Sequence, residues 1–320
     1  YVRWTETRNM EAFLDLLAQG KLNLKSLVTH RFPIERANGA YELITGKTGE
    51  VSLGVLMTYS EQAEQVHRLE LVSRNGESAS EKSIAVGMFG AGNFATSTLI
   101  PAMNKISGLK LVGICSATGS HARHAAQKFG FRYCATEEDE ILTDSAVNTV
   151  VIATRHNLHA SQVLAAVAAE KHVFCEKPLC LTEDELGEIV NVFQKSTAGR
   201  NLMLGLNRRF SPMAVRMKQF VSQINEPLML NYRINAGYIP ADHWVNDPEQ
   251  GGGRILGEVC HFVDLLTFLA GALPIEIQTR NVANPGQYSG ENVAISLTFA
   301  NGTQGTITYI ASGDKSYSKE

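Results

Sequence analysis

Three ionisable side chains lie on one expected helix near residue 260, among apolar neighbours. Glu258, His261 and Asp264 are spaced three residues apart within residues 256–270, so each neighbouring pair shares a helix face. Histidine exchanges a proton near neutral pH, and a carboxylate one turn away can fix its tautomer. The pattern predicts a proton-transfer group, and the alternative is a core histidine held by Asp264. A metal site on Glu258 and His261 would lack a third ligand at a diagnostic spacing, so we expect no metal.

A lysine in the tripeptide Glu176-Lys177-Pro178 is the second candidate for acid–base chemistry. The tripeptide follows an expected short strand at 173–174, and Pro178 stiffens the turn. At the carboxyl end of a parallel strand, Lys177 would point into the crevice in which such sheets bind their ligands, with Glu176 next to it. Desolvation there lowers the pKa of an amine and lets it exchange a proton with a substrate oxygen. Alone, the tripeptide is typical of a surface turn. Its place in a strand–helix series favours the catalytic interpretation.

A glycine turn follows the first strand of that series. Residues 84–89 form an apolar run typical of a short buried strand, and Gly90-x-Gly92-x-x-Ala95 leads into a helical pattern. Gly90 permits the tight turn, Gly92 lets the backbone approach a pyrophosphate, and small Ala95 lets helix pack on strand. The free N–H groups of the helix start attract the anion. In this context the motif, with Asn93 and Phe94 inside it, predicts dinucleotide binding, and a purely structural turn is the alternative.

The end of the second strand, residues 109–115, bears on the choice between NAD and NADP. An acidic residue about 20 positions beyond the turn usually binds the ribose hydroxyls of NAD. No Asp or Glu occurs from Asn93 through Thr136. Ser116 and Arg123 could instead receive a 2′-phosphate, so the sequence slightly favours NADP. The alternative is that Arg123 belongs to a solvated helix face.

The loop after the third main strand, residues 147–153, supplies further candidates. It reads Thr154-Arg155-His156-Asn157-Leu158-His159, at a position where such a loop meets cofactor and substrate. We expect Thr154, Arg155, Asn157 and His159 at the cofactor, although His159 at a helix start could be structural.

Two later loops supply candidate substrate residues. In Asn207-Arg208-Arg209-Phe210, we expect Arg209 either to bind an anionic group or to form a salt bridge between domains. His243 and Trp244 precede the glycine run 251–253. Their rings could form the wall of a sugar-sized pocket or belong to ordinary packing between domains.

Composition excludes several classes of protein. The chain has 320 residues, of which 44% are apolar and 19% charged, with a net charge of −3, so neither nucleic acid nor a membrane is expected as a partner. The five cysteines are odd in number and scattered, which favours reduced thiols in the cytoplasm over a disulfide framework. No signal peptide is visible.

Four segments are expected. Residues 1–59 read as two helices and a strand, and residues 60–82 as a polar linker. Residues 83–206 alternate strand and helix, which predicts an α/β, doubly wound parallel Rossmann sheet. Residues 207–320 predict an α+β domain with a largely antiparallel open sheet. Because the chain begins with Tyr1 and ends just after a strand, we expect it to be cut from a longer polypeptide, with a final strand missing.

Taken together, the motifs resemble the Gfo/Idh/MocA family, named for glucose-fructose oxidoreductase, inositol dehydrogenase and a rhizopine-catabolism oxidoreductase. The matching elements run in the family's order from the glycine turn through Glu-Lys-Pro and Asn-Arg-Arg-Phe to Gly252-Gly253 and His261-x-x-Asp264. The resemblance implies a Rossmann domain followed by an open-sheet domain, with reactive positions at Lys177 and His261. The family's Asp-x-Gly-x-His is altered, because Gly257 and Val259 stand at its first and third positions. Glu258 is the expected substitute for the missing Asp.

Residues 1–59 resemble the C-terminal end of medium-chain alcohol dehydrogenases, which implies a two-module branch of the family. They contain no cysteine and therefore cannot hold that family's cysteine zinc sites. We expect a structural remnant.

The resemblance implies hydride transfer between NAD or NADP and a sugar, cyclitol or nucleotide sugar. In this hypothesis Lys177 polarises the substrate oxygen, and His261, with Glu258 or Asp264 behind it, handles the proton. A non-catalytic sensor that binds NAD(P) to regulate a partner is the alternative, and an inactive fragment is a third. We also expect a homo-oligomer formed through the C-terminal sheet.

Overall fold

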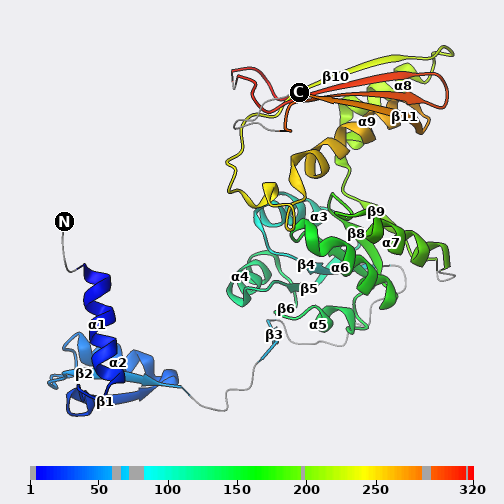
Figure 1. Cartoon of the computed structure of the whole chain (residues 1–320). Coiled ribbons are helices and arrows are strands. Elements are labelled where there is room, and N and C mark those ends of the chain that lie inside the picture. Colours follow the sequence, from blue (N-terminus) through cyan, green and yellow to red (C-terminus); the bar gives the residue numbers. More distant parts are fainter. Residues whose placement is uncertain (1–4, 60–65, 72–82, 196–198, 283–289, 315) are drawn as a thin grey trace. The chain divides into compact units, whose positions relative to one another are not determined.

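The computed structural model describes residues 5–59, 66–71, 83–195, 199–282, 290–314 and 316–320 (Figure 1). The chain divides into two compact units, Tyr1–Val66 and His67–Glu320. No helix in the described ranges has the length and apolar character needed to cross a bilayer.

The N-terminal unit is a small helix–sheet module. Helix α1 (Glu6–Ala18) is capped by Thr5, whose hydroxyl accepts the backbone N–H of Arg8 at 3.2 Å. Strands β1 (Val28–Pro33) and β2 (Gly54–Thr58) pair in parallel, with α2 (Ala37–Ile44) between them in the chain. Of its described apolar side chains, only Ala40 and Leu43 are buried. This unit therefore has very little core of its own.

A seven-stranded sheet organises the second unit. Its order is β3-β6-β5-β4-β7-β8-β9, and every pairing is parallel except that of β3 with β6. The strands are β3 (Arg68–Glu70), β4 (Ile84–Phe89), β5 (Leu109–Cys115), β6 (Tyr133–Ala135), β7 (Thr149–Ile152), β8 (His172–Cys175) and β9 (Leu202–Leu204). The chain winds outward on both sides of β4, so a crevice forms at the carboxyl ends of β4 and β7. The predicted doubly wound sheet is confirmed.

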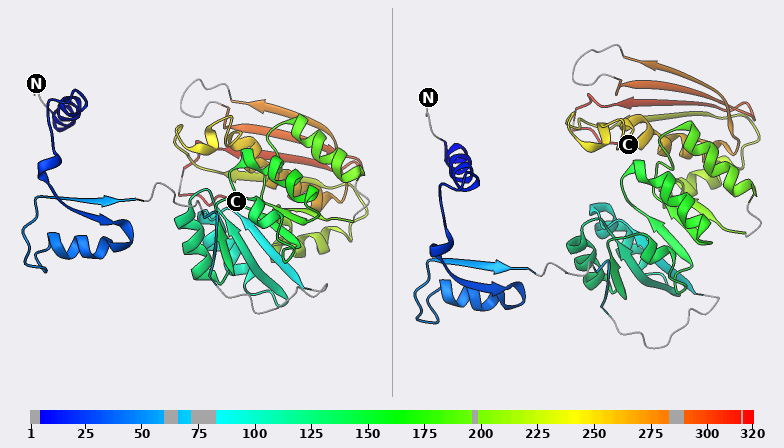
Figure 2. Two further views of the ribbon diagram at one scale, coloured as in Figure 1. Left: turned by 90° about the horizontal axis from the view of Figure 1, so that it is seen from below. Right: turned by 60° about the horizontal axis from the view of Figure 1, so that its bottom comes forward.

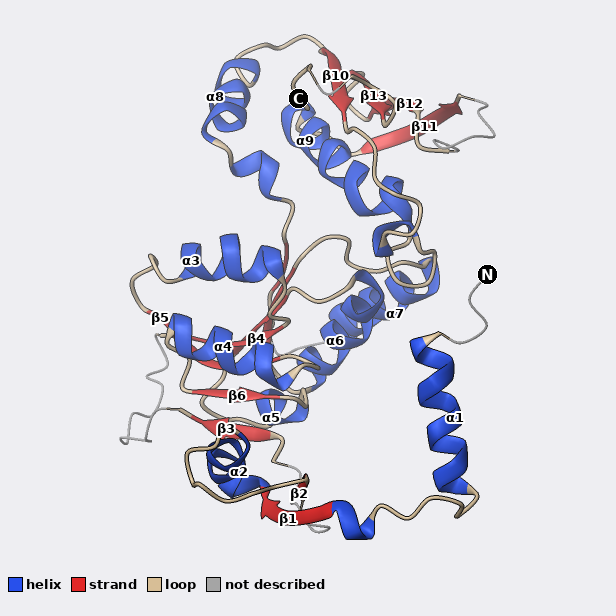
Figure 3. Ribbon diagram, turned by 90° about the vertical axis from the view of Figure 1, so that its left-hand side faces the viewer, coloured by secondary structure: helices blue, strands red, loops and turns tan. Residues whose placement is uncertain are grey.

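Helices cover both faces of this sheet (Figure 3). They are α3 (Ile100–Met103), α4 (Gly119–Phe129), α5 (Asp139–Leu142), α6 (His156–Ala168) and α7 (Glu183–Lys195). One core joins the sheet to α3 and α4 through side chains such as Ile100 and Ala122. The other joins it to α5, α6 and α7 through Ile141, Val163 and Ile189. Because both faces are covered, the strands are apolar along almost their whole length.

The linker expected at 60–82 is wrong where the structure describes it. Strand β3 lies inside that range and forms the antiparallel edge of the sheet, with Leu69 opposite Cys134. The backbone N–H of Thr136 donates to the carbonyl of His67 at 2.9 Å. Residues 60–65 and 72–82 lie outside the described residues. Strand β6 and helix α5 were also absent from the expected elements.

The C-terminal part is a four-stranded sheet with helices on one face (Figure 2). The strand order is β10-β13-β12-β11, with β10 and β13 parallel and the other pairs antiparallel. The elements are α8 (Pro212–Val221), β10 (Met229–Asn235), α9 (Cys260–Ala270), β11 (Pro274–Asn281), β12 (Val293–Phe299) and β13 (Gln304–Ile310). Phe262 of α9 is fully buried against Leu297 and Ile307. On the other face, Asn231 and Ser296 are exposed. The predicted open, mostly antiparallel sheet is confirmed.

Candidate active site

The glycine turn closes β4 as predicted. Gly90 has a φ of 95°, and a Cβ there would lie 2.4 Å from the carbonyl oxygen of Ala153, so only glycine fits. A Cβ on Gly92 would meet nothing within 4 Å, so the space beside its backbone is open. Ala95 is buried in the core between the following helical turn and the sheet. Strand, turn and helix therefore follow one another as a dinucleotide cradle requires.

A cavity of about 890 Å³ extends from this turn across the carboxyl ends of β4, β5, β6 and β7. Its volume falls in the range typical of ligand pockets. The predicted cofactor residues in its wall are Gly90, Gly92, Asn93, Phe94, Ala95, Ser116, Thr154 and Arg155. Most of the predicted cofactor site is thus one continuous surface, and the open backbone at Gly92 fits a dinucleotide.

Substitutions at the two glycines should separate folding from binding. Gly92→Ala is expected to keep the midpoint temperature of the parent. It should bind NADH and NADPH about tenfold more weakly, because the new methyl group fills the space left for the pyrophosphate. Gly90→Ala should lower the midpoint temperature, because its methyl group collides with the Ala153 carbonyl and its positive φ is strained. Differential scanning fluorimetry and calorimetric titration measure both effects. Parental affinity in Gly92→Ala would contradict the cradle.

Two residues predicted to bind cofactor lie elsewhere. Arg123 lies on α4 with an exposed side chain, and it lines neither this cavity nor the second cavity, which lies next to it. The Asn157 side chain is also exposed, and its backbone N–H donates to the carbonyl of Gln250 at 3.2 Å. Arg123 therefore behaves as the solvated helix face that the sequence left open as an alternative.

A second cavity of about 480 Å³ lies between the Rossmann sheet and α9. It meets the first cavity at four residues that line both, namely Phe94, Ala153, Thr154 and Trp244. The predicted residues that line it are His159, Glu176, Lys177, Trp244, Glu258 and His261. Residues separated by about a hundred positions in the chain therefore share one chamber beside the cradle.

Lys177 reaches into this chamber from the end of β8. Its ammonium donates a hydrogen bond to the carbonyl of Gly257 at 2.8 Å, across to the segment that leads into α9. The Lys177–Pro178 peptide bond is cis. Glu176 beside it is 9% exposed, and burial raises the pKa of its carboxyl while the Lys177 charge opposes that rise. The ammonium is thus held at the cavity wall with an acid next to it.

His261 enters the same chamber from α9. Its side chain is 6% exposed, and its Nδ1 is buried with no hydrogen-bond partner among the described residues. Burial, followed by the positive charges of Arg208 and Lys177, lowers the pKa of His261 to about 4. At neutral pH the imidazole is therefore uncharged, and it can accept a proton or a hydrogen bond from a bound molecule.

The two carboxylates expected behind His261 point to other partners. The Asp264 carboxylate receives the Arg209 guanidinium, with Nε 2.8 Å from Oδ2. Glu258 accepts Arg254 Nη2 at 3.3 Å and also contacts the Tyr309 hydroxyl and the Lys319 ammonium. These contacts lower the pKa of Glu258 against the effect of burial.

Neither carboxylate therefore fixes the His261 tautomer in this structure. Sharing a helix face did not determine the pairing, because each acid found a stronger cationic partner. The alternative of a core histidine held by Asp264 is likewise wrong.

Arg209 forms a salt bridge, but within the C-terminal part rather than between domains. Its partner Asp264 is on α9, and Arg209 lines neither cavity. Arg208, which the sequence analysis did not select, lines the second cavity instead. The Arg208 guanidinium is held by Glu320, with Nε 3.1 Å from Oε1. Adjacent residues on a single turn point apart, so the motif alone could not assign them.

Trp244 lines both cavities, so its ring is part of a pocket wall, which was the first of the two expectations for it. Its indole meets the His156 ring edge-on at 4.8 Å between centroids, and the Arg155 guanidinium lies 5.7 Å from it. His243 lines neither cavity, and its Nδ1 accepts the backbone N–H of Val245 at 3.3 Å. Trp244 alone of this pair is therefore placed to contact a ligand.

Two buried histidines support the loop after β7. His159 is 1% exposed, and its ring nitrogens lie 2.6 Å from the carbonyl oxygen of Pro178 and 3.3 Å from that of Thr154. His156, which the sequence analysis passed over, lies 2.8 Å through Nδ1 from the carbonyl oxygen of Gly251. Burial lowers the pKa of both, that of His156 to about 4. They tie the Lys177 turn and the loop before α9 to the Rossmann sheet.

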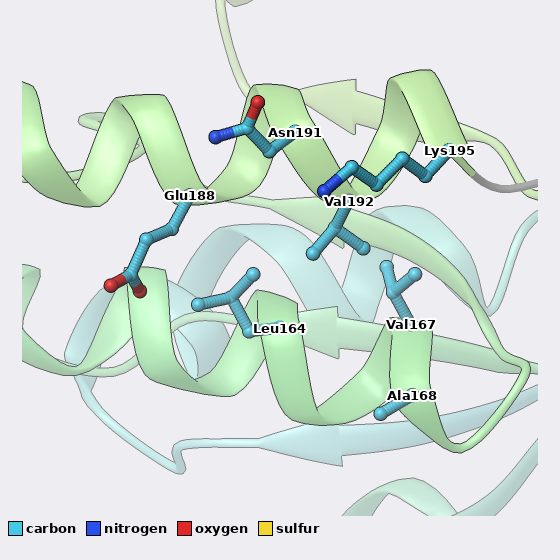
Figure 4. A pocket seen from close by; sticks show the side chains of 7 residues that line it. All are labelled: Leu164, Val167, Ala168, Glu188, Asn191, Val192 and Lys195. Carbon is cyan, nitrogen blue, oxygen red and sulfur yellow. The ribbon is translucent and has the colours of Figure 1, made fainter.

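A further cavity of about 700 Å³ lies between helices α6 and α7 (Figure 4). Leu164, Val167 and Val192 form its apolar floor, and Glu188 and Lys195 lie at its edge. None of the residues predicted for the site lines it. Among the described residues no group of three or more His, Cys, Asp or Glu side chains is placed to hold a metal ion.

Comparison with known proteins defines the class. Residues 84–203 match the oxidoreductase family with an NAD-binding Rossmann fold, and residues 216–317 match the GFO/IDH/MocA C-terminal domain. The chain belongs to the Gfo/Idh/MocA family of oxidoreductases. The resemblance stated from the motifs is confirmed for this part of the chain, whereas the alcohol-dehydrogenase-like origin of residues 1–59 stays a prediction.

Named relatives act on small polyols and sugars. Inositol 2-dehydrogenase of Salmonella typhimurium is 28% identical over 162 residues, covering 49% of this chain and 48% of the relative. The 1,5-anhydro-D-fructose reductase of Ensifer adhaerens is 30% identical over 197 residues, covering 59% and 57%. The chain thus spans about half the length of these curated relatives. The solved myo-inositol dehydrogenase of Lactobacillus casei, in complex with NAD(H) and myo-inositol, shares the fold, with a TM-score of 0.61, 20% identity and coverage of 71% and 68%.

Proposed function

We propose that the chain is an NAD(P)-dependent dehydrogenase or reductase acting on a hydroxyl or carbonyl carbon of a sugar, cyclitol or nucleotide sugar. One observation carries the proposal: Lys177 and His261, from separate elements, line one chamber that opens onto the dinucleotide cradle. The bound nicotinamide would supply or accept the hydride. Its position would be the junction of the two cavities, between Phe94 and Trp244.

Lys177 and His261 divide the proton chemistry in this proposal. The Lys177 ammonium, already oriented by Gly257, donates a hydrogen bond to the substrate oxygen and stabilises negative charge that develops there. In the oxidation, the neutral His261 imidazole takes the proton of the substrate hydroxyl and becomes an imidazolium. In the reduction, that imidazolium returns the proton to the oxygen of the carbonyl group. Glu258 bonds to Arg254, Tyr309 and Lys319, and it holds Arg254 and Lys319 at the chamber wall.

The substrate class rests on the chamber and on the relatives. A volume of about 480 Å³ suits a single sugar ring better than a large molecule. Two cationic side chains of the wall are already paired with carboxylates, Arg208 with Glu320 and Arg254 with Glu258 and Glu291. A neutral polyhydroxyl ring therefore fits better than an anion. Inositol and 1,5-anhydrofructose, named for two relatives, are the first compounds to test.

Two expectations about the rest of the chain remain proposals. The exposed, polar face of the C-terminal sheet, with Asn231 and Ser296 on it, supports a homo-oligomer formed through that face. Residues 1–59 are proposed as a structural remnant that resembles the end of a medium-chain alcohol dehydrogenase. Light scattering of the purified chain tests the first proposal.

A turnover assay separates the enzyme from its alternative. The purified chain is incubated with NAD or NADP and a panel of cyclitols and aldoses, or with NADH or NADPH and 1,5-anhydrofructose, and the nicotinamide absorbance is followed. Among the described residues no carboxylate is hydrogen-bonded to His261 Nδ1, which favours the second candidate, a non-catalytic NAD(P) sensor. Cofactor binding without turnover of any polyol would support the sensor. Turnover of a polyol by the parent, with a lower rate in Gly92→Ala at limiting cofactor, would support the enzyme.

A further inference from the structure

The far end of the dinucleotide cavity has a strongly acidic wall. Relative to the glycine turn, this end lies opposite the Lys177 chamber and would receive the adenosine half of a dinucleotide. It is formed by the end of β5, the start of α4 and the crossover that follows β6. The residues are Ser116, Ala117, His121, Thr136, Glu137, Glu138 and Asp139. Among these lining residues there are three carboxylates and no lysine or arginine.

The crossover lies directly against the end of β5. The backbone N–H of Ser116 donates to the Ala135 carbonyl at 3.1 Å. A Cβ on Gly119 would come within 3.3 Å of the Thr136 methyl group, so the start of α4 touches the same segment. Burial raises the pKa of Cys115, the last residue of β5, to about 12, and the carboxylates of Glu138 and Glu137 add to that rise. These carboxylates therefore act on the position at which a ribose-binding acid normally stands.

Glu138 is held in place by a buried amide. Gln162 of α6 is 2% exposed, and its Nε2 donates to Glu138 Oε1 at 2.5 Å. The Gln162 Oε1 in turn accepts the Thr154 hydroxyl at 2.6 Å. Glu137 is more exposed, and its Oε1 lies 3.6 Å from His67 Nδ1. The Glu138 charge is thus a fixed feature of the cavity wall rather than a mobile surface group.

We propose that Glu138, assisted by Glu137, selects the cofactor by excluding a 2′-phosphate, so that the chain uses NAD(H) in preference to NADP(H). The inference rests on the proposed function. The end of β5 lacks the acidic residue that usually binds the ribose. Glu137 and Glu138, in the crossover that follows β6, take its place. A 2′-phosphate would bring about two negative charges to a wall of three carboxylates, whereas Arg123, the cation expected to receive it, does not line the cavity. Repulsion of like charges at short range is the discriminating element.

Binding measurements test the proposal without relying on turnover. NADH and NADPH are titrated calorimetrically into the whole chain at low ionic strength. The parent is expected to bind NADH at least about tenfold more tightly than NADPH, and Glu137→Gln/Glu138→Gln should reduce that ratio about fivefold or more, mainly through tighter NADPH binding. Glu138→Gln keeps an acceptor for Gln162 and should account for most of the change. Added salt should lower the ratio of the NADPH to the NADH dissociation constant more in the parent than in the double variant.

The control is Glu188→Gln on α7, outside both cavities of the site. It removes one negative charge, as Glu138→Gln does, and it should leave the ratio unchanged. Equal or tighter NADPH binding by the parent would overturn the proposal, as would an unchanged ratio in the double variant. If the double variant unfolds, the single variant of exposed Glu137 still gives the direction of the change, and no shift there would also count against the proposal. Failure of both nucleotides to bind would instead overturn the proposed function and this inference together. If the chain binds cofactor and turns over a polyol, but the ratio of the two dissociation constants does not change in the double variant, only this inference would be overturned.

Discussion

Turnover by Lys177→Ala should fall by about 10²–10⁴-fold, the usual contribution of a positioned acid–base group. The dissociation constant of NADH should change by less than about threefold, which is under 1 kcal/mol, because the Lys177 ammonium lines the substrate chamber and not the dinucleotide cradle. Among the described residues that line the chamber, the one other lysine is Lys319, and its ammonium is engaged by Glu258. Steady-state kinetics and calorimetric titration provide the two measurements.

Loss of the ammonium also leaves the Gly257 carbonyl without its donor, so a folding control is needed. Lys177→Met keeps most of the aliphatic packing and should show the same kinetic loss with a smaller change in midpoint temperature. Lys195→Ala, on the edge of the α6–α7 cavity, removes an equivalent charge outside the site and should retain full turnover. Full turnover by Lys177→Ala with normal cofactor binding would remove the lysine from the mechanism.

His261→Ala should cost a similar factor, about 10²–10⁴-fold, in the oxidation of a polyol. The Nδ1 atom of this imidazole is buried without a hydrogen-bond partner among the described residues, and His261 lines the chamber, so the ring is placed to accept the proton. His261→Asn retains a polar group but cannot exchange a proton at neutral pH, and it should be as impaired as alanine. Recovery of more than about a tenth of the parental rate by His261→Asn would exceed what a lost general base allows and would assign the histidine a structural role.

The pH dependence gives an independent check on His261. Its folded-state pKa is lowered to about 4, so the imidazole remains a competent base well below the ordinary histidine value of about 6.5. The rate of oxidation should therefore show no acid limb near pH 6.5. Arg208→Gln removes a positive charge that lowers this pKa, so the pKa should rise. A nuclear magnetic resonance titration of His261 in both proteins measures it, and an unchanged pKa in Arg208→Gln would contradict the electrostatic explanation.

Short elements and long-range charge pairs could not be read from the chain. Strands β3 and β6 have three residues each, which is too few for an alternating pattern to stand out. Their pairing depends on segments more than sixty residues apart. Asp264 lies on the His261 helix as predicted, and Glu258 lies in the π-helical segment Ile255–Val259 that leads into it. Arg209, Tyr309 and Lys319 nevertheless bind these two carboxylates in place of the imidazole. A helix face restricts which groups can meet, and the packed neighbours decide which do.

The amino-acid sequence by itself determined the glycine cradle, the parallel winding of the sheet and the two candidate reactive groups, Lys177 and His261. These follow from local rules, because a tight turn needs glycine, a strand buried on both faces needs a continuous apolar run, and proton transfer needs titratable side chains. Only the tertiary structure decided which side chains share a cavity. It left the exposed Arg123 outside the cavity wall, brought the Glu138 crossover to the end of β5 and placed Arg208 rather than Arg209 in the chamber. Electrostatic fields and cavity walls are built from residues far apart in the chain, so they exist only once the chain has folded.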